Sequence, residues 1–121
     1  MGDKMRTNKM RTARNTVVIG MVLLHAIAAA GWAGQLVAWG YDSYGLVSNT
    51  PAGNNFAAAA AGGIHNVALK TDGSLVAWGW DNYGQVSNTP AGNNFAAVAA
   101  GYDHNVALKS DGSLVAWGLD T

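Results

Sequence analysis

The chain has 121 residues with equal numbers of acidic and basic side chains, and its charged share of 12% is about half the usual one. It contains no cysteine, so disulfides, thiolate metal sites and cysteine nucleophiles are excluded. Five of the seven basic residues precede residue 16, and the weakly acidic remainder has no electrostatic reason to bind phosphate backbones, which argues against nucleic acid as a partner.

The first predicted element is an export signal over residues 1–33. Its first part is basic and polar, and the apolar stretch from Val17 to Ala33 is interrupted only by His25. Small residues close this stretch. The three-part order is typical of a secretory signal peptide, and we expect a helix there. Cleavage is expected after Ala33, with Ala30 as the alternative.

An uncleaved membrane anchor is the other interpretation of this segment. A spanning helix needs about 20 apolar residues, whereas this stretch has 17 and is rich in Gly and Ala. A cleaved signal is therefore favoured. It predicts a secreted, periplasmic or cell-surface protein with no membrane contact after cleavage. The long basic part leaves two translation starts open, at Met1 and Met10.

A repeat follows the signal. A Trp-Gly pair recurs every 39 residues, at Trp39, Trp78 and Trp117. The copies are residues 34–72, residues 73–111 and a partial copy at 112–121. The two full copies align without gaps and share 31 of 39 positions. Self-similarity at this period indicates a repeat architecture.

Each repeat is predicted to supply four short antiparallel strands, which make one blade of a β-propeller. The apolar run Phe95 to Ala100 is the innermost strand, and Asn105 to Lys109 and Ser113 to Trp117 alternate as the next two. Asp111-Gly112 predicts a two-residue hairpin turn between them. A fourth strand is expected near Gln85 to Ser87.

The alanine run at 57–61 has two interpretations. Alanine has the highest helix propensity, but this run is only a few residues long and lies between Phe56 and Gly62. Its counterpart in the next copy contains Val98. We therefore expect an innermost strand, because small side chains fit where blades converge.

Three motifs resemble the regulator of chromosome condensation repeat family over all of residues 34–121. They are Val-Ala-Trp-Gly at 76–79, Tyr-Gly-Gln at 83–85, and Ala-Gly-x-x-His-Asn-Val-Ala-Leu-Lys-x-Asp-Gly at 100–112. The similarity is greatest to the short bacterial form, which includes secreted propeller-type β-lactamase inhibitory proteins and alpha-tubulin suppressor-like proteins. The resemblance implies an all-β fold that closes with seven blades, of which this chain would be a partial propeller. A fragment of a larger protein is the favoured expectation, and a homo-oligomer that completes a ring is the alternative.

The candidate binding residues lie in turns that a four-stranded blade places on one face. They are Tyr41, Tyr44, Trp80, Tyr83 and Tyr102. Five of the eight differences between the two full copies also fall in or beside these turns. Because Tyr and Trp anchor interfaces, we expect a protein-binding surface. For Tyr44 and Tyr83, which are identical in both copies, packing between blades is the alternative.

The remaining recurrent residues are expected to be structural. The resemblance implies a local structural role for His65 and His104, and the three tryptophans of the Trp-Gly pairs are expected to pack between blades. No loop groups several carboxylates, and no nucleophile has a nearby base. We therefore expect no metal, no cofactor and no enzyme activity.

These features predict an exported, non-catalytic propeller that binds a protein. Two alternatives stay open at this point. One is a purely structural repeat segment of a larger cell-surface protein, and the other is a carbohydrate-binding propeller that uses the same aromatic side chains.

Overall fold

The computed structural model describes residues 16–19, 27–28 and 33–120. Within these residues the regular structure is all β apart from one short 3-10 turn. The elements are β1 (Thr16–Ile19), β2 (Ile27–Ala28), β3 (Gln35–Ala38), η1 (Ser43–Gly45), β4 (Phe56–Ala61), β5 (His65–Lys70), β6 (Leu75–Gly79), β7 (Phe95–Ala100), β8 (His104–Lys109) and β9 (Leu114–Gly118).

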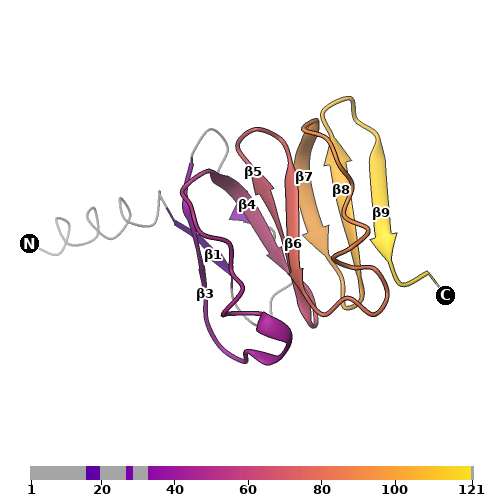
Figure 1. The fold of residues 1–121 in the computed structure, drawn as a ribbon. Helices are drawn as coiled ribbons and strands as arrows, with labels where there is room; N and C mark the ends of the chain where they lie inside the picture. The colour runs from indigo at the N-terminus through magenta and orange to yellow at the C-terminus, as the bar shows by residue number, and fades with distance from the viewer. Residues whose placement is uncertain (1–15, 20–26, 29–32, 121) are drawn as a thin grey trace, which may run out of the picture.

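The repeats build three-stranded antiparallel meanders, each of which takes two strands from one copy and its third strand from the next copy. The strands β4, β5 and β6 form one meander and β7, β8 and β9 form the next, with the same register one repeat apart. The short strand β2 extends the first sheet beside β4, and β1 pairs in parallel with β3. The sheets follow one another across the molecule in chain order (Figure 1).

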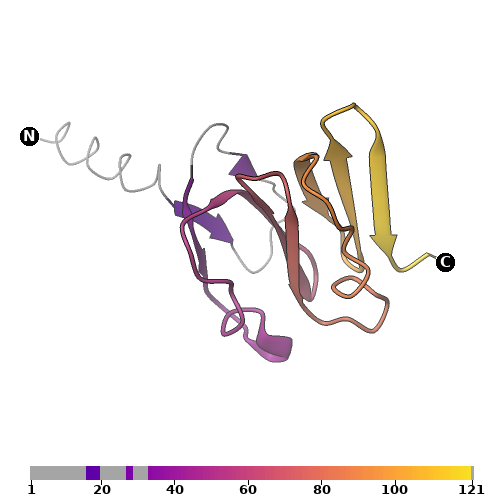
Figure 2. The same ribbon diagram turned by 45° about the horizontal axis from the view of Figure 1, so that its top comes forward.

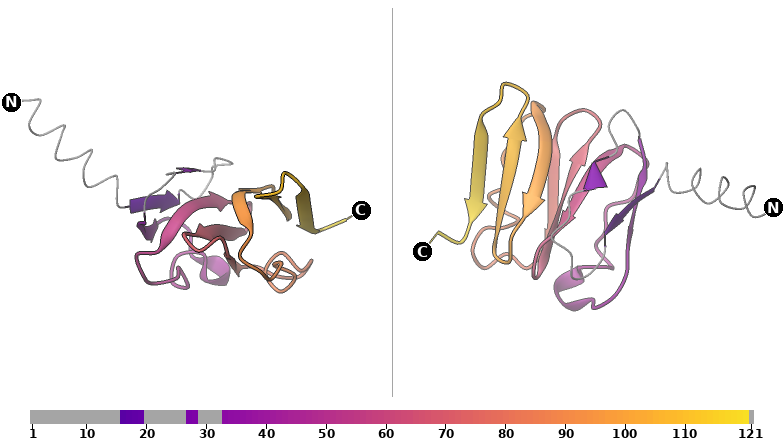
Figure 3. Two further views of the ribbon diagram at one scale, coloured as in Figure 1. Left: turned by 90° about the horizontal axis from the view of Figure 1, so that it is seen from above. Right: turned by 180° about the vertical axis from the view of Figure 1, so that it is seen from behind.

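The sheets pack face to face through small side chains. Ala58 and Ala60 on β4 lie in one core cluster with Val98 and Ala100 on β7. Methyl side chains allow the two sheets to approach closely, and the packed face removes apolar surface from water. Seen from above, the meanders lie one behind the other (Figure 3). The prediction that both alanine-rich runs form strands and not helices is confirmed.

The fourth strand expected near Gln85 to Ser87 is wrong. These residues form consecutive turns, because the Asp81 carboxylate accepts hydrogen bonds from the backbone N–H groups of Val86 and Ser87, at 2.7 and 2.8 Å. Donors that a strand would direct to a neighbouring strand are thereby satisfied locally. In the preceding copy, the Asp42 carboxylate accepts hydrogen bonds from the equivalent N–H groups of Val47 and Ser48. The repeat therefore supplies three strands to each sheet, and the fourth strand of the first sheet is β2.

The hairpin turn is one residue longer than predicted. The Lys70 N–H donates to the Ser74 carbonyl, and the Gly73 N–H donates to the Lys70 carbonyl. The loop therefore spans Thr71, Asp72 and Gly73, with Gly73 at φ +86°. This is the three-residue hairpin in which a left-handed glycine restores the strand pairing.

The predicted export signal at residues 1–33 lies mostly outside the described residues. The two segments of it that the structure describes, β1 and β2, are strands, so the helix expected there is not found in them. Among the described residues, no helix has the length and apolar content needed to cross a membrane.

Candidate functional site

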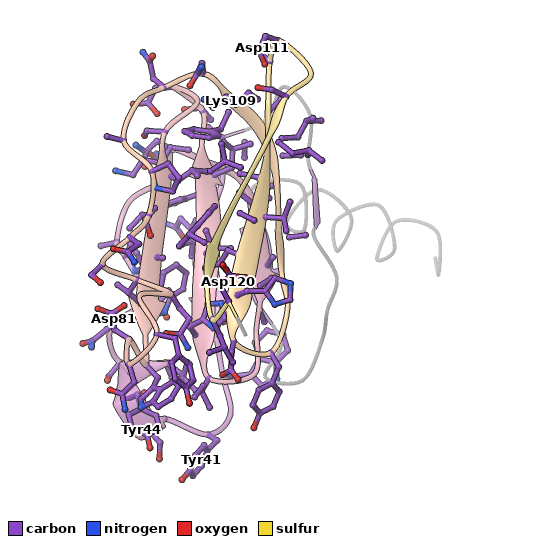
Figure 4. The ribbon with its side chains drawn as sticks, turned by 90° about the vertical axis from the view of Figure 1, so that its right-hand side faces the viewer. Tyr41, Tyr44, Asp81, Lys109, Asp111 and Asp120 are labelled. Atoms are coloured by element: carbon purple, nitrogen blue, oxygen red, sulfur yellow. The ribbon has the colours of Figure 1, made fainter. Side chains whose placement is uncertain are left out.

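The turns expected to share a face do meet at one end of the sheets. The Trp80 N–H donates to the Ile64 carbonyl at 2.9 Å, and the Gly63 N–H donates to the Tyr102 carbonyl at 3.2 Å. These bonds join the third turn of one blade to its first turn, and that first turn to the next blade. Tyr41 and Tyr44 lie at this end and Asp111 lies at the opposite one (Figure 4). The turn η1 and the start of the loop after β6 also lie at one end (Figure 2).

Three of the five predicted aromatic residues form one cluster. The Tyr44 and Trp80 ring centroids lie 6.2 Å apart with planes tilted by 58°, and those of Trp80 and Tyr83 lie 5.1 Å apart in an edge-to-face arrangement. Such geometries are favourable for aromatic pairs. Because Tyr44 belongs to the first copy and Trp80 to the second, the cluster also joins the two repeats.

The structure agrees only in part with the alternative that Tyr44 packs between blades. Its ring contacts the next repeat, yet its side chain remains 58% exposed, and that of Tyr83 is 43% exposed. Tyr102 is the most exposed of the predicted tyrosines, at 69%. Its ring lies against Gly63, where a Cβ atom would collide with it. We call the end that carries Tyr41, Tyr44, Trp80, Tyr83 and Tyr102 the aromatic end.

Tyr44 has an unusual backbone conformation. Its φ of 62° is positive, and among the described residues no other non-glycine residue shares this property. A left-handed residue with a side chain costs roughly 1–2 kcal/mol. The Asp42 carboxylate holds the turn through two backbone N–H groups, which lower the pKa of Asp42. Backbone strain of this kind is concentrated at functional sites.

The aromatic end is also acidic. Four carboxylates lie in or beside its turns, at Asp42, Asp81, Asp103 and Asp120. The opposite end carries the two lysines of the repeats, Lys70 and Lys109, next to the hairpin loops. Figure 4 shows this separation, with Asp81 and Asp120 on the side of Tyr44, and Lys109 near Asp111.

His65 is a structural residue, in agreement with the expectation. Its side chain is fully buried, and its Nε2 lies 2.8 Å from the Asn105 Oδ1 atom in the next repeat. The Asn105 amide and the Trp117 indole N–H groups both donate to the Gln85 carbonyl, each at 3.0 Å. Neither Asn105 nor the Gln85 carbonyl was predicted to act here. The recurrent His-Asn pair in both copies was the available signal.

His104 and Trp39 depart from their repeat counterparts. His104 is exposed, because no further repeat in the described chain presents an asparagine to it. Trp39 is 52% exposed, whereas Trp78 and Trp117 are buried. Each buried tryptophan donates its indole N–H to the loop carbonyl at residue 46 or 85 of the preceding repeat. The expectation that Trp39 packs between blades is wrong, because the described residues provide no preceding repeat loop for it.

Acidification is expected to weaken the contact between the repeats. Burial lowers the pKa of His65, and the hydrogen bond that its Nε2–H donates to the Asn105 Oδ1 atom opposes this shift only in part. The unfolded chain therefore binds the proton more readily than the folded one. The free energy of unfolding should be constant above about pH 6.5 and should fall as the pH drops below it. Urea titrations between pH 7.5 and 5.0 would measure this before the aspartates titrate.

The control for this pH dependence is the second histidine. His104→Gln should retain the loss of stability between pH 7.5 and 5.0, whereas His65→Gln should remove most of it. If both variants lose the pH dependence equally, the buried ring of His65 is not its source.

The described residues contain no group of three or more His, Cys, Asp or Glu side chains that could hold a metal ion.

The comparison with known families identifies the repeat. The Regulator of chromosome condensation (RCC1) repeat matches residues 52–85 and 95–121. The chain belongs to this family. Each matched RCC1 range contains one three-stranded meander, β4 to β6 or β7 to β9, so the family unit agrees with the observed sheets. A search of curated proteins finds no match.

Proposed function

We propose that this RCC1-repeat chain is an exported, non-catalytic module that binds a protein partner through its aromatic end, as part of a larger propeller. The observation that supports the proposal most is the cluster of Tyr44, Trp80 and Tyr83. Tyr44 and Tyr83 are exposed and Trp80 is half-buried beside them. Tyr and Trp side chains combine large apolar area with few torsions to restrict, and they are the commonest anchors of interfaces.

The distribution of differences between the copies supports the same end. Residues that satisfy the fold, such as His65, Asn105 and the Asp81 cap, are the same in both copies. At the aromatic end, Tyr41 changes to Trp80 and Gly63 changes to Tyr102. Side chains of different size and chemistry are therefore accepted at these turns, which supports a role in contacts with another molecule.

The charge of the aromatic end favours a basic partner. Four carboxylates lie in or beside the turns of the aromatic end, whereas at the opposite end the two lysines of the repeats are balanced by Asp72 and Asp111. A surface of one charge sign attracts the opposite sign and accelerates association. The partner is therefore proposed to present lysine or arginine side chains around an apolar centre.

Alanine substitution at Trp80 and Tyr102 tests this function. Each variant is expected to weaken partner binding by at least about tenfold, because a central aromatic anchor contributes about 2 kcal/mol or more. Extracellular proteins would be captured on the immobilised wild-type chain, and the dissociation constant of each enriched protein would then be measured with the variants.

Lys109→Ala provides the control at the opposite end and should leave that dissociation constant unchanged. Circular dichroism would verify that all variants keep the strand signal. Equal binding of a captured protein by wild type and both alanine variants would refute the proposal. Retention of glycans, and not of proteins, on an array would instead favour the carbohydrate-binding alternative.

A further inference from the structure

One face of the last sheet is apolar and uncovered. We call it the open face. It consists of Ala97, Ala99, His104, Val106, Leu108 and Leu114. Leu108 and Leu114 are 38% and 69% exposed. Figure 3 shows β9 at the outer side of the molecule, with no further sheet beyond it among the described residues.

The preceding repeat shows how the same face is covered. The counterparts on the first sheet are Ala58, Ala60, His65, Val67, Leu69 and Leu75. Five of these six are buried and Leu75 is partly buried against the same core cluster. These six side chains and the strand registers are the same in the two sheets. The main difference is the second sheet, which lies on the first one and has no counterpart on the last one in the described chain.

The covering surface is also present a second time in the chain. The side chains that cover the first sheet are Phe95, Val98, Ala100, Ala107 and Trp117. The first sheet carries the same set one repeat earlier, as Phe56, Ala59, Ala61, Ala68 and Trp78. Only one of the five differs, by the two methyl groups that separate Ala59 from Val98. A second copy of this chain therefore has a surface complementary to the open face.

Within one molecule this complementary surface is occupied by β3, whose Leu36 packs against it. Among the residues that the structure describes, this segment is bridged to β4 only from Gly34 to Phe56, and β3 otherwise pairs with β1. Cleavage after Ala33, as predicted above, would remove β1. The strand β9 contains the same Leu-Val-Ala-Trp-Gly sequence as residues 36–40, and it is held by five register pairs with β8.

We propose that the open face binds a second copy of this chain, head to tail, with β9 taking the place of the partner copy's β3. Leu114 then occupies the position of Leu36, and the exposed His104 meets Asn66 of the second copy as His65 meets Asn105. Exchange of identical elements between copies is a low-cost route to association, because the contacts formed replace equivalent contacts.

A pocket at the edge of the open face supports this arrangement. It has a volume of about 440 Å³ and includes Asn88, His104 and Trp117 in its walls. At the equivalent place one repeat earlier, His65 is covered by Asn105, and Gly62 lies against the Gly101 carbonyl. The pocket is therefore the position that the second copy's strand and turn would fill.

Sedimentation equilibrium of the full chain tests the inference. The wild type is expected to associate as its concentration rises. Ala99→Arg places an unpaired charge in the contact and should raise the dissociation constant about 100-fold or more. Ala91→Arg is the matched control, because this alanine is exposed in the loop between the two sheets, and it should change the dissociation constant less than about twofold.

A mixing experiment separates head-to-tail binding from a symmetric dimer. An affinity-tagged Ala99→Arg chain keeps its first sheet intact, so it should retain untagged wild type although it does not associate with itself. A monomeric wild type would overturn the proposal. So would association that Ala99→Arg leaves unchanged, or a tagged variant that fails to retain wild type. None of these results depends on the aromatic end, whose function is tested separately.

Discussion

Gly73→Ala is expected to destabilise the protein by about 2–5 kcal/mol, of which the upper part is enough to unfold a marginal domain. Gly73 has φ +86° in the hairpin loop, where a side chain costs about 1–2 kcal/mol. A Cβ atom there would also collide with the backbone carbonyl of Asn93, which lies in the loop that leads to β7. Backbone atoms cannot move aside as a flexible side chain does, so overpacking adds about 1–3 kcal/mol.

Gly112→Ala is the matched control for this substitution. Gly112 occupies the same turn one repeat later at φ +89°, and no atom lies within 4 Å of the position of its Cβ. Only the conformational cost of about 1–2 kcal/mol should remain. Urea denaturation of the two variants gives the difference directly. Equal losses would mean that the loop of the second repeat does not press on Gly73.

The architecture of the repeat was predictable from the sequence because its signals are local and occur twice. The alternation from Asn105 to Lys109 and the apolar run at 95–100 each predicted a strand that the structure shows. The Asp-Gly pairs predicted the place of the hairpin turns, although each loop is one residue longer than expected. The shared end of the aromatic turns was also predicted, since it follows from the direction of consecutive strands.

The errors concern interactions that depend on a neighbour. The strand expected at Gln85 to Ser87 fails because Asp81 satisfies two backbone amides from five and six residues away, which no alternation of side chains reveals. Trp39 was expected to be buried like Trp78 and Trp117, yet the burial of this tryptophan requires the loop of a preceding repeat. In the same way, His104 and His65 are identical in sequence and opposite in exposure. Periodicity predicts the unit, whereas the contents of each interface depend on the unit beside it.

His65→Ala is expected to lower the free energy of unfolding by about 3 kcal/mol. The substitution removes a fully buried ring between the two sheets and leaves a cavity. It also deprives the Asn105 Oδ1 atom of its partner at 2.8 Å, and a buried polar atom without a partner costs about 1–3 kcal/mol.

His104→Ala is the matched control. His104 is the first residue of β8, as His65 is the first residue of β5, but its side chain is exposed. The substitution should therefore cost at most about 0.5 kcal/mol. Thermal and urea unfolding would be measured at a concentration low enough to keep the chain monomeric. Similar losses in the two variants would contradict the assignment of His65 as the residue that joins the repeats, because the histidines differ only in the sheet that covers them.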